Sequence, residues 1–264
     1  MTRTARLIVC TAFLAAACWM PQASFAESPF DGTWRVDLGK TKISPKPIVF
    51  YLSQGWYHCV SCNPAYDVQA DGQDHAVTGQ TFDTLAITVV DPNTIKVVYK
   101  KDGKVDTEST RSVSADGKLL TVKSTSHPMN SDHPVTSEAT AKLVGVAPSA
   151  VHATSGSWQI SKVSQSDNAL LVTYKTSGDE ITMSQPTGET YTAKLDGTDT
   201  PYKGSYSTDT VSIKRIDPHT IEETDKRGGE VVEVDKITVS GKTMTIVATN
   251  KRADRTSTYV ATKK

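Results

Sequence analysis

Two cysteines, spaced as Cys59-Val60-Ser61-Cys62, are the residues whose types most directly suggest chemistry. This spacing predicts a local disulfide. Such a bridge closes a small ring, so its entropic stabilisation is well below that of a long loop. A redox pair is an alternative, because a thiolate at a helix N-terminus is activated. The neighbouring Tyr57 and Pro64 do not indicate a helix.

Zinc is a second alternative for the cysteine pair, because imidazoles can complete a tetrahedron with two thiolates. His75 is the candidate third ligand. His58 adjoins Cys59, and successive residues of a strand point to opposite faces. Haem attachment would need a His directly after Cys62, where Asn63 stands. With the disulfide preferred, we expect no metal and no cofactor.

A charged pair, Arg215 and Glu222, flanks a predicted hairpin turn at residues 217–220. If these four residues form the turn, Ile216 faces Ile221 and Arg215 faces Glu222 across the two strands. In a barrel lumen this pair would fix a polar group of a ligand, because buried charges need partners. On the outer face it would be a solvent-exposed pair. The predicted ligand contacts are Tyr57, Tyr66, Arg215 and Glu222.

Catalytic motifs are absent from the sequence: it has no G-x-S-x-G, H-E-x-x-H or G-x-G-x-x-G pattern. Residues 240–243 (S-G-K-T) resemble the end of a phosphate-binding loop, but the upstream glycine is missing. They also occupy the position that a hairpin turn has in the first repeat, so we interpret them as a turn. We therefore predict no catalytic residue, which weighs against an enzyme.

A duplication determines where these residues lie. The stretch Asp83–Ile95 (D-T-L-A-I-T-V-V-D-P-N-T-I) recurs 126 residues later as Asp209–Ile221 (D-T-V-S-I-K-R-I-D-P-H-T-I). Gly32-Thr33-Trp34 likewise recurs as Gly156-Ser157-Trp158. These matches predict two repeats, 27–145 and 155–264, joined by a linker at 146–154.

The pattern within each repeat favours β-structure throughout. Thr and Val are abundant, no window shows helical periodicity, and turn dipeptides such as Asp102-Gly103 recur about every 8–12 residues. An up-and-down sheet that closes on itself leaves no exposed edge. The sequence therefore predicts an all-β fold with two tandem antiparallel up-and-down β-barrels. Repeats built as β-sandwiches are the alternative.

The Gly-x-Trp motif at the first strand of each repeat resembles the lipocalins and the wider lipocalin- and avidin-like barrels. The resemblance implies that Trp34 and Trp158 plug the barrel ends and that a basic side chain of the last strand covers them. Arg255 is the candidate cover for Trp158. The chain also looks like a group of bacterial secreted proteins of unassigned activity, through the stretches W-Y-x-C-x-x-C, A-D-G-x-D-H and K-R-I-D-x-x-T-I-E-E-T-D-K-R.

The N-terminal segment has the pattern of a secretory signal peptide. Two arginines precede the apolar run Leu7–Ala17, and Ser24 and Ala26 suit a cleavage site that ends the signal at 26. The run is shorter than the roughly 20 residues that span a bilayer. A lipid anchor at Cys18 is the alternative. We expect a periplasmic or extracellular protein in an oxidising compartment.

The overall charge limits the partners. The formal net charge is zero, so the chain lacks the excess of positive charge that attracts nucleic acid or anionic lipid. Barrels of about eight strands can hold one small molecule. The sequence therefore predicts a binding module for a small, partly apolar ligand. A structural, envelope-associated protein with filled barrels and a redox or zinc protein centred on Cys59 and Cys62 are the alternatives.

Overall fold

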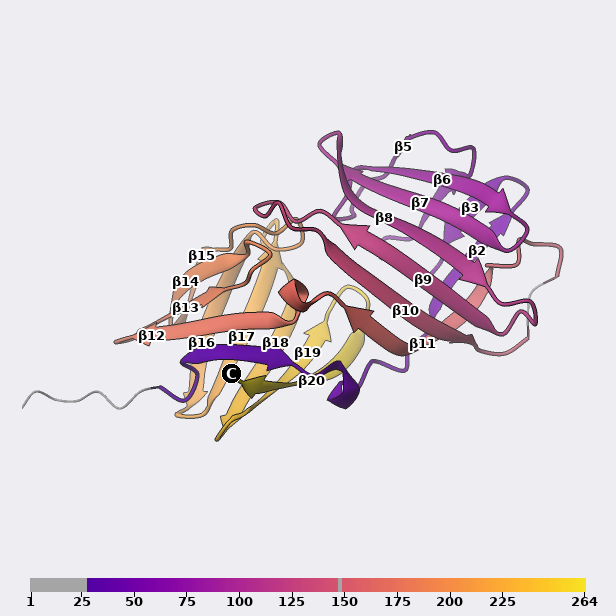
Figure 1. Ribbon diagram of the computed structural model, residues 1–264. Coiled ribbons are helices and arrows are strands. Elements are labelled where there is room, and N and C mark those ends of the chain that lie inside the picture. The colour runs from indigo at the N-terminus through magenta and orange to yellow at the C-terminus, as the bar shows by residue number, and fades with distance from the viewer. Residues whose placement is uncertain (1–27, 147–148) are drawn as a thin grey trace, which may run out of the picture.

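The computed structural model describes residues 28–146 and 149–264, which form two ten-stranded antiparallel sheets (Figure 1). Each sheet curls into a nearly closed barrel, so the predicted all-β class with two tandem barrels is confirmed. The predicted signal peptide, 1–26, lies outside the described residues. Within the described ranges, no helix is long and apolar enough to cross a membrane.

The first barrel is a continuous stretch of chain. Its strands are β2 (Ile48–Ser53), β3 (Trp56–Cys59), β4 (Tyr66–Gln69), β5 (His75–Ala76), β6 (Thr84–Asp91), β7 (Thr94–Lys101), β8 (Lys104–Val113), β9 (Leu119–Ser126), β10 (Val135–Leu143) and β11 (Gly156–Gln165). The predicted hairpin of the first repeat is β6 and β7, which pair antiparallel.

The second barrel combines the C-terminal part of the chain with its first strand. Its strands are β1 (Gly32–Val36), β12 (Leu171–Ser177), β13 (Glu180–Ser184), β14 (Thr190–Lys194), β15 (Asp196–Pro201), β16 (Thr210–Asp217), β17 (Thr220–Arg227), β18 (Glu230–Ser240), β19 (Thr243–Asn250) and β20 (Arg255–Lys263). Two 3₁₀-helices complete the fold, η1 (Leu38–Lys40) and η2 (Asp167–Ala169).

The Gly-x-Trp strands exchange places between the repeats. Strand β1 lies between β12 and β20 of the second barrel, and Figure 1 shows this indigo strand among the orange and yellow ones. Strand β11 lies between β10 and β2 of the first barrel. The barrels therefore do not coincide with the repeats 27–145 and 155–264, because each barrel takes its Trp strand from the other repeat.

The two tryptophans occupy matching places in the two cores. Trp34 is fully buried in the second barrel and Trp158 is 1% exposed in the first. Each indole Nε1 donates to a carbonyl oxygen four residues earlier, at 2.8 Å to Phe30 and 2.9 Å to Thr154. The motif needs glycine because a Cβ at Gly32, where φ is +117°, would lie 2.6 Å from Lys263 Cε.

The exchange also changes which cation covers which tryptophan. Arg255 does not reach Trp158, because Trp158 lies in the other barrel; its guanidinium donates instead to the carbonyl of Pro47 at 2.8 Å. Lys263, on the last strand, places its Nζ 5.8 Å from the Trp34 ring centroid. In the first barrel, Leu143 pairs with Trp158 at the position equivalent to Lys263. The predicted basic cover thus exists for one tryptophan, and the residue is Lys263.

Strand exchange predicts how fragments of the chain behave. A fragment 46–166 contains all ten strands of the first barrel and should unfold cooperatively in urea. The fragment 28–145 matches the sequence repeat but lacks β11 and the buried Trp158 side chain, whose loss alone costs about 3–5 kcal/mol. It should therefore stay unfolded or associate. Far-UV circular dichroism during urea titration distinguishes the two, and a cooperative 28–145 fragment would contradict the strand order.

Candidate functional site

Cys59 and Cys62 form a disulfide, with their Cα atoms 5.4 Å apart. The nearby histidines are engaged elsewhere. His58 Nδ1 lies 2.7 Å from Asp67 Oδ1, and His75 Nε2 lies 2.8 Å from Asp71 Oδ1. Among the described residues, no group of three or more His, Cys, Asp or Glu side chains could hold a metal ion. The predicted disulfide is confirmed.

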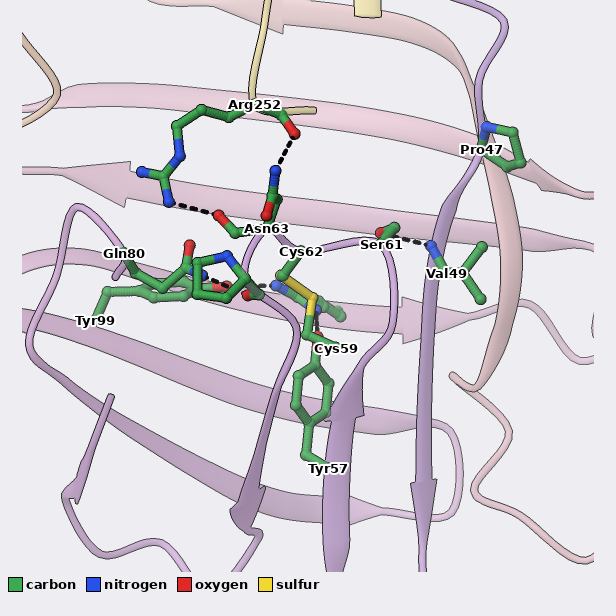
Figure 2. The surroundings of a disulfide bond; sticks show 12 residues. Pro47, Val49, Tyr57, Cys59, Ser61, Cys62, Asn63, Gln80, Tyr99 and Arg252 are labelled. Atoms are coloured by element: carbon green, nitrogen blue, oxygen red, sulfur yellow. Dashed lines mark hydrogen bonds between the residues drawn. A yellow bond between two sulfur atoms is a disulfide. The ribbon is translucent and has the colours of Figure 1, made fainter. Parts of the chain in front are cut away.

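The disulfide shapes a loop that contacts the other barrel (Figure 2). The loop is bonded back to β2, where Val49 N donates to Ser61 Oγ at 2.9 Å. Asn63 then projects towards the turn between β19 and β20, and its Nδ2 donates to the Arg252 carbonyl at 2.8 Å. Arg252 in return donates to the carbonyl of Asn63. The bridge therefore positions a contact between the barrels.

Removing the bridge should loosen this contact. Replacing Cys59 and Cys62 with Ser is expected to lower the free energy of unfolding by about 2 kcal/mol, since the closed ring is small. Urea unfolding of the variant and the parent chain measures the difference. An unchanged free energy of unfolding would contradict the positioning role.

Tyr57 and Tyr66 lie in the lumen of the first barrel. The Tyr57 hydroxyl accepts a hydrogen bond from Arg111 at 2.7 Å, and the Tyr99 hydroxyl accepts one from the same guanidinium at 2.6 Å. Burial raises the pKa of Tyr57. Consecutive ring contacts at 4.8–6.5 Å join five aromatic residues: Phe50, Tyr57, Tyr66, Phe82 and Tyr99. The two predicted ligand contacts thus belong to a packed aromatic cluster around Arg111.

Arg215 and Glu222 do not face each other. In the β16–β17 hairpin Arg215 pairs with Ile221, and Lys214 pairs with Glu222. The register shifts between Arg215 and Asp217, so Ile216 is the extra residue of a bulge. Because of this extra residue, the side chains of β16 that precede Ile216 pair one position earlier along β17 than the predicted register has them. Arg215 and Glu222 are both exposed, and the predicted ion pair is not formed.

Four carboxylates instead line the lumen of the second barrel. Glu223 and Asp225 come from β17, and Glu233 and Asp235 from β18. In the strand register Glu223 is opposite Asp235, and Asp225 is opposite Glu233. Like charges directly opposite each other are destabilising. We call these four residues the acidic cluster.

Burial and mutual repulsion keep protons on the acidic cluster. Burial, then Asp225, raises the pKa of Glu223 to about 8. Burial, then Glu233, raises the pKa of Asp235 to about 9 and that of Asp225 to about 7. Burial also raises the pKa of Glu233. Because the groups interact, they titrate together as a set. Near neutral pH the cluster therefore retains protons that ordinary carboxyl groups have released.

The acidic cluster borders an internal cavity of about 240 Å³. Apart from Gln185, the rest of the lining is tyrosine and apolar: Tyr174, Tyr202, Tyr259, Val172, Met183, Ile237 and Ile246 are among its residues. Tyr191 donates its hydroxyl proton to Glu223 Oε2 at 2.7 Å. The Oδ1 atoms of Asp225 and Asp235 are buried without a hydrogen-bond partner.

Two further cavities share lining residues with the acidic cavity and lie on the side of the first barrel. A cavity of about 210 Å³ shares Tyr202, Asp225 and Glu233 with it and also contacts Thr81 of the first barrel. Another, of about 370 Å³, shares Ala169 and Gln185 and runs between the barrels. The acidic cavity is thus bordered, towards the first barrel, by two further hollows.

The acidic cluster has a signal in the sequence, although none of its four residues is among the predicted ligand contacts. Glu223-x-Asp225 and Glu233-x-Asp235 have the spacing that puts both members of each pair on one face of a strand. The equivalent residues of the first repeat are Val97, Tyr99, Thr107 and Ser109, none of which carries a charge at neutral pH. Comparison of the repeats therefore marks the cluster.

Beyond its own internal repeat, the chain matches no protein-family model and no curated protein.

The raised pKa values predict that the protein is less stable at higher pH. The unfolded chain releases the protons of these carboxyl groups near pH 4, whereas the folded barrel holds them until about pH 7–9. The folded state therefore binds more protons in between, and the free energy of unfolding falls as pH rises from about 5 to 9. We expect Tm to decrease by on the order of 5 °C over this range.

A matched pair of variants tests this source of pH dependence. Glu223→Gln with Asp235→Asn should flatten the dependence of Tm on pH. Glu222→Gln with Glu230→Gln removes two exposed carboxylates from the same strands and should leave it unchanged. Differential scanning calorimetry at pH 5, 7 and 9 makes the measurement. A Tm that rises with pH in the parent chain would contradict the protonated state of the cluster.

Proposed function

We propose that this chain is a secreted binding protein that holds a small, partly apolar amine in the lumen of its second barrel. The observation that carries the proposal is the acidic cluster itself, four carboxyl side chains that line one cavity without a basic residue among its lining. An ammonium group donates three hydrogen bonds and carries the opposite charge. Binding it would relieve the repulsion within the acidic cluster.

The remaining lining fits the rest of such a ligand. Tyr174, Tyr202 and Tyr259 provide aromatic faces, which attract cations as well as apolar groups. The cavity of about 240 Å³ is below the roughly 300–1,000 Å³ of sites for drug-sized ligands. The ligand is accordingly a small metabolite. A location in the periplasm or outside the cell agrees with the predicted signal peptide and with a disulfide, which persists in oxidising compartments.

The first barrel has a different function in this proposal. Its lumen is occupied by Arg111 and the aromatic cluster around it, with the guanidinium 5.0 Å from the Phe50 ring centroid. A filled barrel supports a structural role, which was the alternative for the whole chain. We assign that role to the first barrel. Its strand β2 pairs with β11, and its residue Thr81 lines the cavity beside the second lumen.

Isothermal titration with amines tests the binding function. At pH 8 the intact protein should bind 1,5-diaminopentane or tyramine, whereas p-cresol, which is tyramine without its aminomethyl group, should bind at least about tenfold more weakly because it has no charge for the cluster. Binding should release protons, seen as a heat that depends on the ionisation enthalpy of the buffer.

Variants locate the bound amine. Glu223→Gln with Asp235→Asn should reduce amine affinity by about tenfold or more, because charge-assisted hydrogen bonds are lost. The exposed control, Glu222→Gln with Glu230→Gln, should bind like the parent. If neither amine binds, or if both double variants bind equally well, the second lumen is not an amine site.

A further inference from the structure

Two arginines border the space that continues from the acidic cluster. Arg227 ends β17, and Arg252 lies in the turn between β19 and β20. Both line the cavity of about 210 Å³, together with Asp225 and Glu233 of the acidic cluster. This one cavity therefore has both carboxylates and guanidinium groups in its lining and also contacts Thr81 of the first barrel.

The two guanidinium groups are held close together. Arg227 Nη2 donates to the carbonyls of Gly79 and Gln80 at 3.1 and 2.9 Å. Arg252 Nη2 donates to the same Gly79 carbonyl oxygen and to that of Asn63; Figure 2 shows its side chain extending over this loop of the first barrel. Two cations that share one acceptor repel each other, and an anion between them would remove that repulsion.

The arginines also have unused hydrogen-bonding capacity. Arg227 Nη1 is buried and has no hydrogen-bond partner. Within the described part of the chain, neither guanidinium forms an ion pair with a carboxylate. Burial and the neighbouring charge of Arg252 lower the pKa of Arg227. The guanidinium fork matches the two oxygens of a carboxylate.

We propose that the ligand of the second barrel is an amino acid, whose carboxylate binds Arg227 and Arg252 and whose amino groups bind the acidic cluster. This inference rests on the proposed amine site and adds the second half of the ligand. The strand spacing supports it, because Asp225 and Arg227 are two residues apart on β17 and lie on the same face. Glu223, two residues further in, would take a second amino group on the side chain.

A matched pair of ligands separates this inference from the proposed function. Lysine and 1,5-diaminopentane differ only by the carboxylate of lysine. Titration of the intact protein at pH 8 should show lysine binding at least about tenfold more tightly, because a carboxylate–guanidinium contact is charge-assisted and bidentate. Tyrosine and tyramine form a second pair with the same difference.

Variants of the arginine pair give the readout that a purely structural role would not change. Arg227→Met should remove the preference for lysine while leaving the affinity for 1,5-diaminopentane within about twofold or raising it, since a like charge is gone. Asn63→Ala removes a contact of Arg252 with the first barrel but keeps both cations, so the preference should persist. A loss of affinity for both ligands in both variants would assign the arginines to the barrel contact alone.

The outcomes are distinct. If 1,5-diaminopentane binds and lysine binds no more tightly, the carboxylate site is refuted and the amine site stands. If lysine is preferred and Arg227→Met abolishes the preference, the carboxylate site is supported. If no ligand of either pair binds, the amine site and this inference both fail.

Discussion

Each of the two sheets can close only with a tenth strand, and the chain provides that strand from the neighbouring repeat. Strand β1 fills the gap between β12 and β20, and β11 fills the gap between β10 and β2. Each inserted strand also brings the large tryptophan of a barrel core. Closure and core packing therefore depend on the same exchange, and the lumen of the second barrel exists only when the N-terminal strand is in place.

The two lumens use this common architecture in opposite ways. In the first, the guanidinium of Arg111 is satisfied by two tyrosine hydroxyls and by ring faces. In the second, cross-strand pairing puts carboxylates opposite carboxylates, which costs stability unless protons or a cation offset the repulsion. This arrangement lowers the free energy of unfolding of the second barrel. Groups with strongly shifted pKa values are common at functional sites.

Local patterns in the sequence predicted a large part of this structure. Alternating residues and turn dipeptides identified the strands, and the duplicated hairpin was correctly placed because its turn chemistry is local. The strand exchange was not predictable, since the Gly-x-Trp strands are alike and either fits either barrel. The bulge at Ile216 was missed because I-K-R-I-D gives no sign of an extra residue, and the error moved Arg215 and Glu222 onto the wrong partners. The contact between Arg252 and Asn63 joins residues 189 apart, which no local pattern reveals.

The position of β1 has a consequence for the order in which the chain becomes structured. All strands of the first barrel are contiguous, so this barrel can form as soon as residue 165 has been made. Strand β1 emerges earlier but pairs with β20, whose last residue is Lys263. One edge of the first strand must therefore wait for the last strand made, whereas its other edge can pair earlier with β12. Such long-range closure is slow and leaves strand edges open to other chains. The second barrel is thus the part of the protein for which a chaperone that binds the incomplete chain would matter most.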